Sequence, residues 1–143
     1  IRTFKDGKYL FKATAAGTAK KVELAALSNP RKGGIIAIDP SEGDKLVGVE
    51  LTGGKDELVL ATLEGQAVRF NEEDVRAMGR GAAGVRGAKL ADKDQVVSLV
   101  MAPPGSMVLT ICEKGYGKRS PVEDYRLIRR GGSGVGLSSL MPP

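Results

Sequence analysis

A period of fifty residues runs through this chain and limits what it can fold into. The period is marked by three glycines that each precede a β-branched residue, Gly34, Gly84 and Gly134. Asp44 and Asp94 keep the same step. In repeat architectures a unit cannot bury its apolar face alone and packs on its neighbour. We therefore expect three similar units rather than one irregular core.

Each unit begins with a hairpin signal. A glycine lies between two short strand-like runs and supplies the positive φ angle of a tight turn, at Gly17, Gly65 and Gly115. Two further apolar runs follow, as at 35–38 and 46–51 in the first unit. Because no stretch shows sustained helical periodicity, helical repeats are disfavoured. The sequence predicts an all-β fold of propeller-like blades, with less than about a tenth of its residues in helices.

The domain organisation follows from the same period. The third unit lacks a counterpart of Asp94, and its apolar alternation ends in the segment from Gly136 to Pro143. We therefore expect this unit to be incomplete and the array to form only part of a ring. The expected organisation is a single repeat domain over 1–143, with blades at about 7–53, 54–104 and 105–143.

Basic residues recur in register with the repeat. The chain has 22 Lys and Arg against 17 Asp and Glu, a net charge of +5 that suits a polyanionic partner. The fourth residue after each hairpin glycine is basic, at Lys21, Arg69 and Arg119. A small residue two positions earlier shares its strand face. We expect this face to look outward.

Loops rich in glycine and arginine form a second basic feature. Such loops let the main chain approach a phosphate backbone while arginines bind its oxygens without reading bases. The alternative is solvated charge around ordinary turns, and recurrence in register favours DNA binding. Aromatic residues are only 4% of the chain, which disfavours single-strand binding by base stacking. The candidate DNA-binding residues are Lys20, Lys21, Arg31, Lys32, Arg69, Arg76, Arg80, Arg86, Lys118, Arg119, Arg126, Arg129 and Arg130, and the loop glycines are Gly34, Gly84 and Gly134.

The sequence contains a glycine pattern of the nucleotide-binding type without the flanking elements that such a site needs. Gly79, Gly81 and Gly84 spell G-x-G-x-x-G, but an acidic stretch precedes them and a strand-like stretch follows. The motif binds a pyrophosphate only between a strand and a helix N-terminus. We therefore expect no nucleotide cofactor.

Other catalytic and metal chemistries are also disfavoured. The chain has no His, so it offers no Ser-His-Asp or Cys-His nucleophile, and its single Cys112 cannot build a cysteine zinc site. We expect Cys112 to be a small buried thiol in a reducing cytoplasm. No apolar run approaches the roughly 20 residues of a membrane span, and no signal-peptide pattern is present, so we expect a soluble protein without a membrane partner.

Several motifs in one order resemble the C-terminal domain of the A subunit of bacterial DNA gyrase and, more distantly, that of topoisomerase IV. They are GTAKK (17–21), DKLVGVELT (44–52), EGQAVRF (64–70), VRAMGRGAAGVRG (75–87), KDQVVSLV (93–100) and GYGKRSPVEDY (115–125). The resemblance implies a β-pinwheel, a ring of blades that exchange strands and bend DNA around a basic rim. Family members carry more blades than the three copies seen here.

The segment from Arg129 to Gly134 is similar to the family's gyrase A box, written Q-R-R-G-G-K-G. Ile128 replaces its Gln and Ser133 its Lys. The family's box lies in its first blade, whereas the neighbouring motif of this chain resembles a later one. We interpret residues 129–134 as the equivalent loop of a later blade, with a true box as the alternative.

The resemblance also implies a function. It implies non-sequence-specific binding and wrapping of double-stranded DNA that serves supercoiling by a gyrase-type topoisomerase. The implied partners are gyrase B and the catalytic portion of the gyrase A subunit, in the bacterial cytoplasm at the nucleoid. Catalytic residues are then expected to lie outside this chain. The alternative function is a β-propeller-like scaffold that binds an acidic protein.

Overall fold

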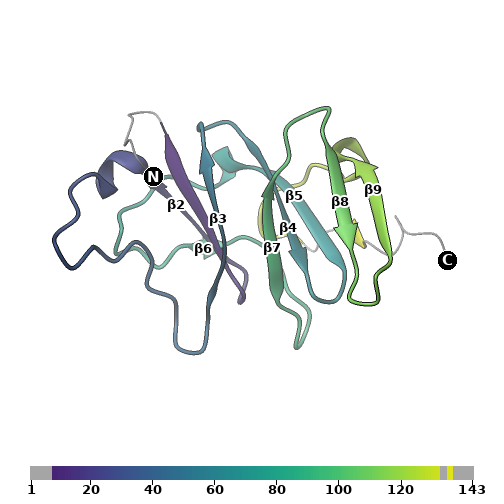
Figure 1. Ribbon diagram of the computed structural model, residues 1–143, viewed down its shortest axis with the longest axis horizontal. Coiled ribbons are helices and arrows are strands. Elements are labelled where there is room, and N and C mark those ends of the chain that lie inside the picture. Colours follow the sequence, from purple (N-terminus) through teal and green to yellow (C-terminus); the bar gives the residue numbers. More distant parts are fainter. Residues whose placement is uncertain (1–7, 133–134, 137–143) are drawn as a thin grey trace.

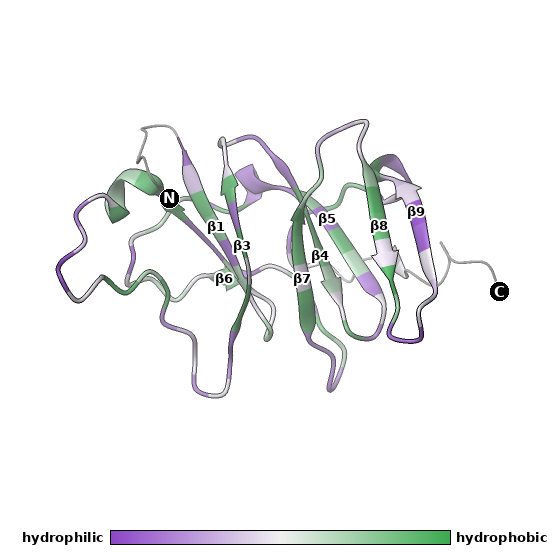
Figure 2. Ribbon diagram, viewed as in Figure 1, coloured by the Kyte–Doolittle hydropathy of each residue, from purple (hydrophilic) through white to green (hydrophobic). Residues whose placement is uncertain are grey.

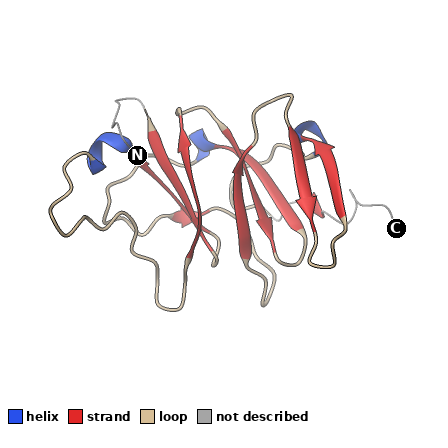
Figure 3. Cartoon of the chain, viewed as in Figure 1, coloured by secondary structure: helices blue, strands red, loops and turns tan. Residues whose placement is uncertain are grey.

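The computed structural model of the chain describes residues 8–132 and 135–136. Short antiparallel strands form three sheets that stand side by side along the longest axis (Figure 1). In this described part the helices are single 3-10 turns, coloured blue in Figure 3, and no α-helix occurs. They are η1 (Leu24–Leu27), η2 (Glu72–Asp74) and η3 (Val122–Asp124). The prediction of an all-β fold is confirmed.

The first two sheets have four strands each in the same kind of order. The first sheet runs β3 (Leu46–Thr52), β1 (Tyr9–Thr14), β2 (Thr18–Glu23), β6 (Val85–Arg86). The second runs β7 (Val96–Met101), β4 (Glu57–Thr62), β5 (Gln66–Asn71), β10 (Val135–Gly136). The third contains β8 (Met107–Ile111) and β9 (Gly117–Pro121).

The second and third units each contribute one short strand to the sheet of the unit before it. Strand β6 belongs to the second fifty-residue unit but pairs with β2 of the first sheet, so that Ala19 faces Val85 across the pair. Strand β10 belongs to the third unit and pairs with β5 of the second sheet, where Ala67 faces Val135. The exchange of strands that the family resemblance implies is therefore present in both places.

The three hairpins share one register. Ala13 pairs with Ala19 in the first, Ala61 with Ala67 in the second, and Ile111 with Gly117 in the third. The turn glycines between them all have positive φ angles, 86° at Gly17, 81° at Gly65 and 86° at Gly115. Residues other than glycine rarely adopt this conformation. The prediction of hairpins at these glycines is confirmed.

Apolar side chains fill the space between successive sheets. Between the first and second, the rings of Phe11 and Phe70 lie 5.9 Å apart, and Leu58 and Leu60 are fully buried. Gly48 lets the backbone of β3 approach β7 closely. Between the second and third, the core is Val59, Ala67, Ala102, Val122 and Tyr125. Figure 2 shows β7 and β8 as mostly hydrophobic, with hydrophilic residues in β9 and in several of the connecting loops.

The outer face of the third sheet is exposed. Leu109 is 63% exposed and Ile111 68%, although the residues at the same hairpin positions of the first sheet, Phe11 and Ala13, are fully buried. A cavity of about 230 Å³, lined by residues that include Val100 and Tyr125, lies between the second and third sheets. No third strand pairs with β8 among the described residues, whereas β3 and β7 flank the corresponding strands β1 and β4.

The prediction that Cys112 is buried is wrong. The residue directly follows β8 and is exposed. Its counterparts in the first two sheets, Thr14 and Thr62, are buried and face residues of β3 and β7. Because the described part of the third sheet has no such flanking strand, the apolar run around Cys112 is not covered.

The close approach at Gly48 gives a test of the inter-sheet core. A Cβ atom at this position would lie 2.6 Å from Cβ of Leu99, so Gly48→Ala is expected to lower the free energy of unfolding by about 1–3 kcal/mol. The matched control is Gly79→Ala, where an added Cβ meets no atom within 4 Å. Urea unfolding of both variants measures the difference. Equal stabilities would show that the first two sheets do not pack as described.

Candidate nucleic-acid interface

Two of the basic hairpin residues are buried, so the expectation that this face looks outward is wrong for Lys21 and Arg69. The ammonium of Lys21 lies 3.7 Å from the carboxylate of Glu72 and donates to the backbone carbonyl oxygen of Glu72 at 3.0 Å. It also lies 4.9 Å from the ring centroid of Tyr9. Arg69 forms an ion pair with Glu57. Both basic side chains are thereby committed to contacts inside the protein.

Each of these two side chains reaches the 3-10 turn of the next unit. Lys21 reaches η2, and Nη1 of Arg69 donates to the carbonyl oxygens of Val122 at 3.1 Å and Tyr125 at 3.0 Å, at η3. Burial of a cationic group is costly unless hydrogen bonds and counter-charges replace its water. The covering unit supplies those groups. Arg119 occupies the same hairpin position in the third sheet and is exposed.

Glu72 is a structural residue that no sequence motif singled out. Its side chain is fully buried and accepts hydrogen bonds from the hydroxyl of Thr52 at 2.7 Å and from the backbone N–H groups of Gly54 at 2.7 Å and Asp56 at 2.9 Å. Together with Lys21, these donors satisfy the buried carboxylate. The sequence signal was weak, since the third unit has Val122 at the equivalent position.

Lys20 is also buried, together with Lys12 on the neighbouring strand. The two residues face each other across the β1–β2 pair, and each is only 1% exposed. Lys12 donates to the carbonyl oxygen of Ala37, and Lys20 to that of Arg80. Burial, and secondly the charge of Lys20, lowers the pKa of Lys12 to about 8. Burial also lowers the pKa of Lys20, although the carboxylate of Asp39 acts in the opposite direction.

The glycine-arginine loop of the second unit is fastened to β2 at both ends. Its beginning is held by the N–H of Met78, which donates to Lys21 at 2.9 Å, and its end by β6 and by the N–H of Gly87, which donates to Gly17 at 2.7 Å. Gly84 has φ of +90°, and a Cβ there would lie 2.8 Å from the carbonyl oxygen of Ala19. The loop therefore requires glycine at this point for both conformation and space.

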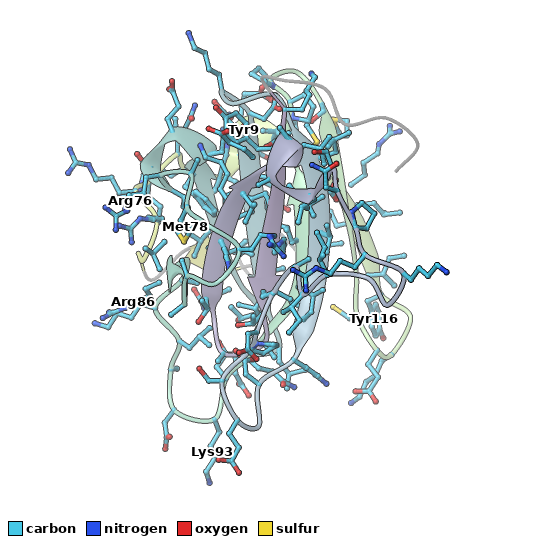
Figure 4. The ribbon with its side chains drawn as sticks, turned by 90° about the vertical axis from the view of Figure 1, so that its left-hand side faces the viewer. Tyr9, Arg76, Met78, Arg86, Lys93 and Tyr116 are labelled. Carbon is cyan, nitrogen blue, oxygen red and sulfur yellow. The ribbon has the colours of Figure 1, made fainter. Side chains whose placement is uncertain are left out.

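The arginine side chains of this loop point into solvent. Arg76, Arg80 and Arg86 are all exposed. Figure 4 shows Arg76 and Arg86 extending from the same side of the molecule. A loop whose backbone is held and whose cationic groups remain solvated can bind an anionic surface without first giving up internal contacts.

The corresponding loop of the third unit lies against the loop of the second. Nε of Arg130 donates to the carbonyl oxygen of Asp74 at 2.8 Å, and its Nη1 to that of Arg86 at 3.2 Å. The N–H of Gly131 donates to Gly87 at 2.7 Å. Arg130 therefore joins the two loops. Arg126 and Arg129 remain exposed, and Gly134 lies outside the described residues.

The remaining candidates are more scattered. Arg31 and Lys32 are exposed on the long connection after η1. The first part of this connection lies at the end of the molecule opposite the third sheet (Figure 1). Gly34 in the same connection has φ of +79°. Lys118 is half-buried on β9, beside the exposed Arg119. The structure thus brings together the basic loops of the second and third units, with the first-unit residues at a distance from the third sheet.

The described residues offer little for other chemistries. They contain no group of three or more acidic, His or Cys side chains arranged to hold a metal ion. No helix in this part of the chain is long and apolar enough to cross a membrane.

Repeated four-stranded sheets that exchange edge strands and carry basic glycine loops define a DNA gyrase C-terminal-type β-propeller domain. Three segments of the chain, 8–52, 56–103 and 106–138, match the family described as "DNA gyrase C-terminal domain, beta-propeller". The chain belongs to this family.

The relatives that this chain resembles in sequence are DNA gyrase A subunits. The chain is 47% identical over 135 residues to the DNA gyrase A subunit of Salmonella typhimurium and 49% identical over 135 residues to that of Klebsiella oxytoca. Each alignment covers 94% of this chain and 15% of the relative's length. The chain therefore corresponds to a small part of these gyrase subunits.

Solved structures show the same fold. The C-terminal domain of DNA topoisomerase IV matches with a TM-score of 0.88 and 30% identity, over 95% of this chain and 43% of that chain. A DNA gyrase A C-terminal domain matches with a TM-score of 0.83 and 29% identity, over 94% of this chain and 45% of that chain. The recognition of the family from sequence motifs is confirmed.

The contact of Arg69 with η3 gives a test of its structural role. Arg69→Met removes the hydrogen bonds to Val122 and Tyr125 and leaves Glu57 without its ion-pair partner. We expect a loss of about 3 kcal/mol in the free energy of unfolding, measured by urea denaturation. The matched control is Arg119→Met, which alters an exposed arginine and is expected to change stability by less than about 0.5 kcal/mol. Equal effects would contradict the structural assignment.

The lowered pKa of Lys12 predicts a pH-dependent stability. Between about pH 7 and pH 10 the native protein releases this proton while the unfolded chain, with its ordinary value of 10.5, retains it. The contribution of Lys12 to stability therefore rises with pH across that window. We expect the melting temperature of the wild type minus that of Lys12→Met to increase from pH 7 to pH 10. The control is Lys32→Met, at an exposed lysine, for which the difference in melting temperature should show no such trend. A difference in melting temperature for Lys12→Met that stays constant from pH 7 to pH 10 would refute the prediction.

Proposed function

We propose that this chain binds duplex DNA through the phosphate backbone, without sequence preference, and bends or wraps it. The observation that carries the proposal is the pair of adjoining glycine-arginine loops, joined through Arg130 and Arg86, that present exposed arginines. Arginines at backbone-exposing loops are suited to phosphate oxygens rather than base edges. Membership of the gyrase C-terminal domain family supports this proposal.

The structure divides the candidate residues by availability. The exposed cations are proposed to contact DNA directly, whereas Lys20, Lys21 and Arg69 are buried and are proposed to hold the fold in place. Arg130 is proposed to order the two loops against each other. The direct contacts are assigned to Arg31, Lys32, Arg76, Arg80, Arg86, Lys118, Arg119, Arg126 and Arg129.

The units are proposed to be blades at about 7–53, 54–104 and 105–143, in a single repeat domain. The three matched family segments and the recurring hairpin register support this division. Residues 129–134 are proposed to be the counterpart of the glycine-arginine loop of the second unit. The bridge between Arg69 and Leu127, which repeats that between Lys21 and Ala77, supports this equivalence.

In a parent topoisomerase, the proposed role is to hold a bent DNA segment for the catalytic machinery. The partners are then gyrase B and the catalytic portion of a gyrase A subunit, in the bacterial cytoplasm at the nucleoid. Cleavage and ATP hydrolysis are proposed to lie outside this chain. Bending a short duplex by 40–90° costs on the order of several kcal/mol, which phosphate contacts must offset.

An acidic protein partner is the second candidate function, because the same exposed arginines suit acidic side chains. A fluorescence measurement of DNA end-to-end distance separates the two functions, since only the DNA function shortens that distance on binding. A topology assay of a parent enzyme with and without this region tests the role in supercoiling.

The second-unit loop gives the direct test of DNA binding. Arg80→Ala combined with Arg86→Ala is expected to weaken binding to all duplex sequences alike and to reduce the slope of log K against log salt by about 0.9 for each phosphate that is no longer bound. The control is Lys45→Ala combined with Lys55→Ala, which removes the same charge from exposed sites outside the glycine loops. Titrations at several salt concentrations measure both. Unchanged affinity and slope in the double arginine variant, with its fold intact by circular dichroism, would refute the loop's role.

A further inference from the structure

The glycine-arginine loop of the second unit has a buried lysine beneath it. Lys20 lies on β2 of the first sheet, is almost fully buried, and donates from its ammonium to the carbonyl oxygen of Arg80. The equivalent of Lys20 in the second sheet is Val68, an apolar residue of the inter-sheet core. Val68 therefore offers no ammonium that could donate to a carbonyl oxygen of the third-unit loop.

Lys20 contacts the middle part of the loop, which lies between the two ends that are held by backbone hydrogen bonds. Strand pairing and hydrogen bonds to β2 fix the loop near Met78 and Gly87. Between these ends lie three glycines and a single turn in which the N–H of Ala82 donates to Gly79 at 3.1 Å. Glycine-rich backbone loses much conformational freedom when it is ordered. A hydrogen bond from a buried cation to Arg80, within this span, offsets part of that cost.

The direction of the contact also places the side chain of Arg80. Its carbonyl oxygen is turned toward the buried ammonium of Lys20, while the residue as a whole is exposed. A charged donor forms a stronger hydrogen bond than a neutral one, which suits an ammonium for this task. Burial lowers the pKa of Lys20, and the nearby carboxylate of Asp39 acts in the opposite direction.

We propose that Lys20 is a positioning residue that holds the second-unit loop in the conformation from which Arg80 contacts a DNA phosphate. The proposal rests on the DNA-binding function proposed above. It assigns Lys20 to the organisation of the loop and not to contact with DNA. Lys12, its neighbour across the strand pair, holds a different segment through Ala37 and supplies a matched control.

The first experiment measures the loop without DNA. Lys20→Met keeps the aliphatic stem but removes the ammonium, so the loop should open more often and trypsin should cleave the Arg80–Gly81 bond about three- to tenfold faster, as the loss of one hydrogen bond implies. Cleavage after Lys114, in the exposed hairpin turn of the third sheet, is the internal reference and should not change. Lys12→Met should leave cleavage after Arg80 unaltered. Mass spectrometry of the digest under native conditions reports all three rates.

The second experiment is a double-mutant cycle in DNA binding with the wild type, Lys20→Met, Arg80→Ala and the combined variant. Lys20→Met alone should weaken duplex binding and lower the salt slope, and it should have no further effect when Arg80 is already Ala. A structural weakening of the whole protein would instead reduce affinity equally in both backgrounds. Melting temperatures and circular dichroism of all four proteins confirm that the fold is retained.

The outcomes are distinguishable. If trypsin cleaves after Arg80 no faster in Lys20→Met than in Lys12→Met, Lys20 does not hold the loop, and the proposal is overturned. Faster cleavage with wild-type DNA affinity, or with equal losses in both backgrounds, overturns the positioning role. Absence of DNA binding by the wild-type chain overturns the proposed function and, with it, the positioning role. The cleavage rates then show only whether Lys20 holds the loop.

Discussion

Burial of one sheet's face against the next is the constraint on which the rest of this structure depends. A single four-stranded sheet of this size has two faces and no core of its own, so its stability comes from the interface with its neighbour. Phe11, Leu60 and Phe70 fill the first interface, and Val59 and Tyr125 fill the second. The same interfaces decide which charged residues are covered, because each sheet carries a basic residue at the same hairpin position. Where a following unit packs, that residue is internal, and at Arg119 it is exposed.

Covered and uncovered cations therefore have different physical roles despite similar sequence surroundings. Lys21 and Arg69 lose water on burial, and carbonyl oxygens of the next unit's 3-10 turn replace it, with Glu72 and Glu57 as counter-charges. Such contacts are directional, so they fix how one unit sits on the next as well as contributing energy. Arg76 and Arg86 keep their water and remain available for a polyanion. A count of positive charges could not have distinguished these groups.

The sequence was sufficient for the architecture and insufficient for the environment of individual residues. The fifty-residue step and the hairpin glycines predicted the repeated all-β sheets, because turn chemistry and strand alternation are local signals. The exchange of strands was expected only from the family resemblance. Strand alternation also predicted that Lys21 shares a face with Ala19, but it could not say that another sheet covers that face. Glu72 and the folding back of Arg130 onto Asp74 and Arg86 depend on contacts between units that are far apart in sequence. Cys112 is exposed for the converse reason, since no described strand flanks β8.

The contacts between loops connect this packing to the proposed function. Each glycine-arginine loop is anchored on the sheet of the preceding unit, through β6 on β2 and β10 on β5, so the spacing of basic loops is set by the spacing of the sheets. Arg130 and Gly131 then join the third-unit loop to the second. Bending DNA costs energy that phosphate contacts can offset only if the protein does not yield instead. In the proposed function, loops that are already ordered need less of the binding energy to arrange them, and more can be directed to the duplex. The burial that stabilises the sheets would thus also determine the path along which the DNA is held.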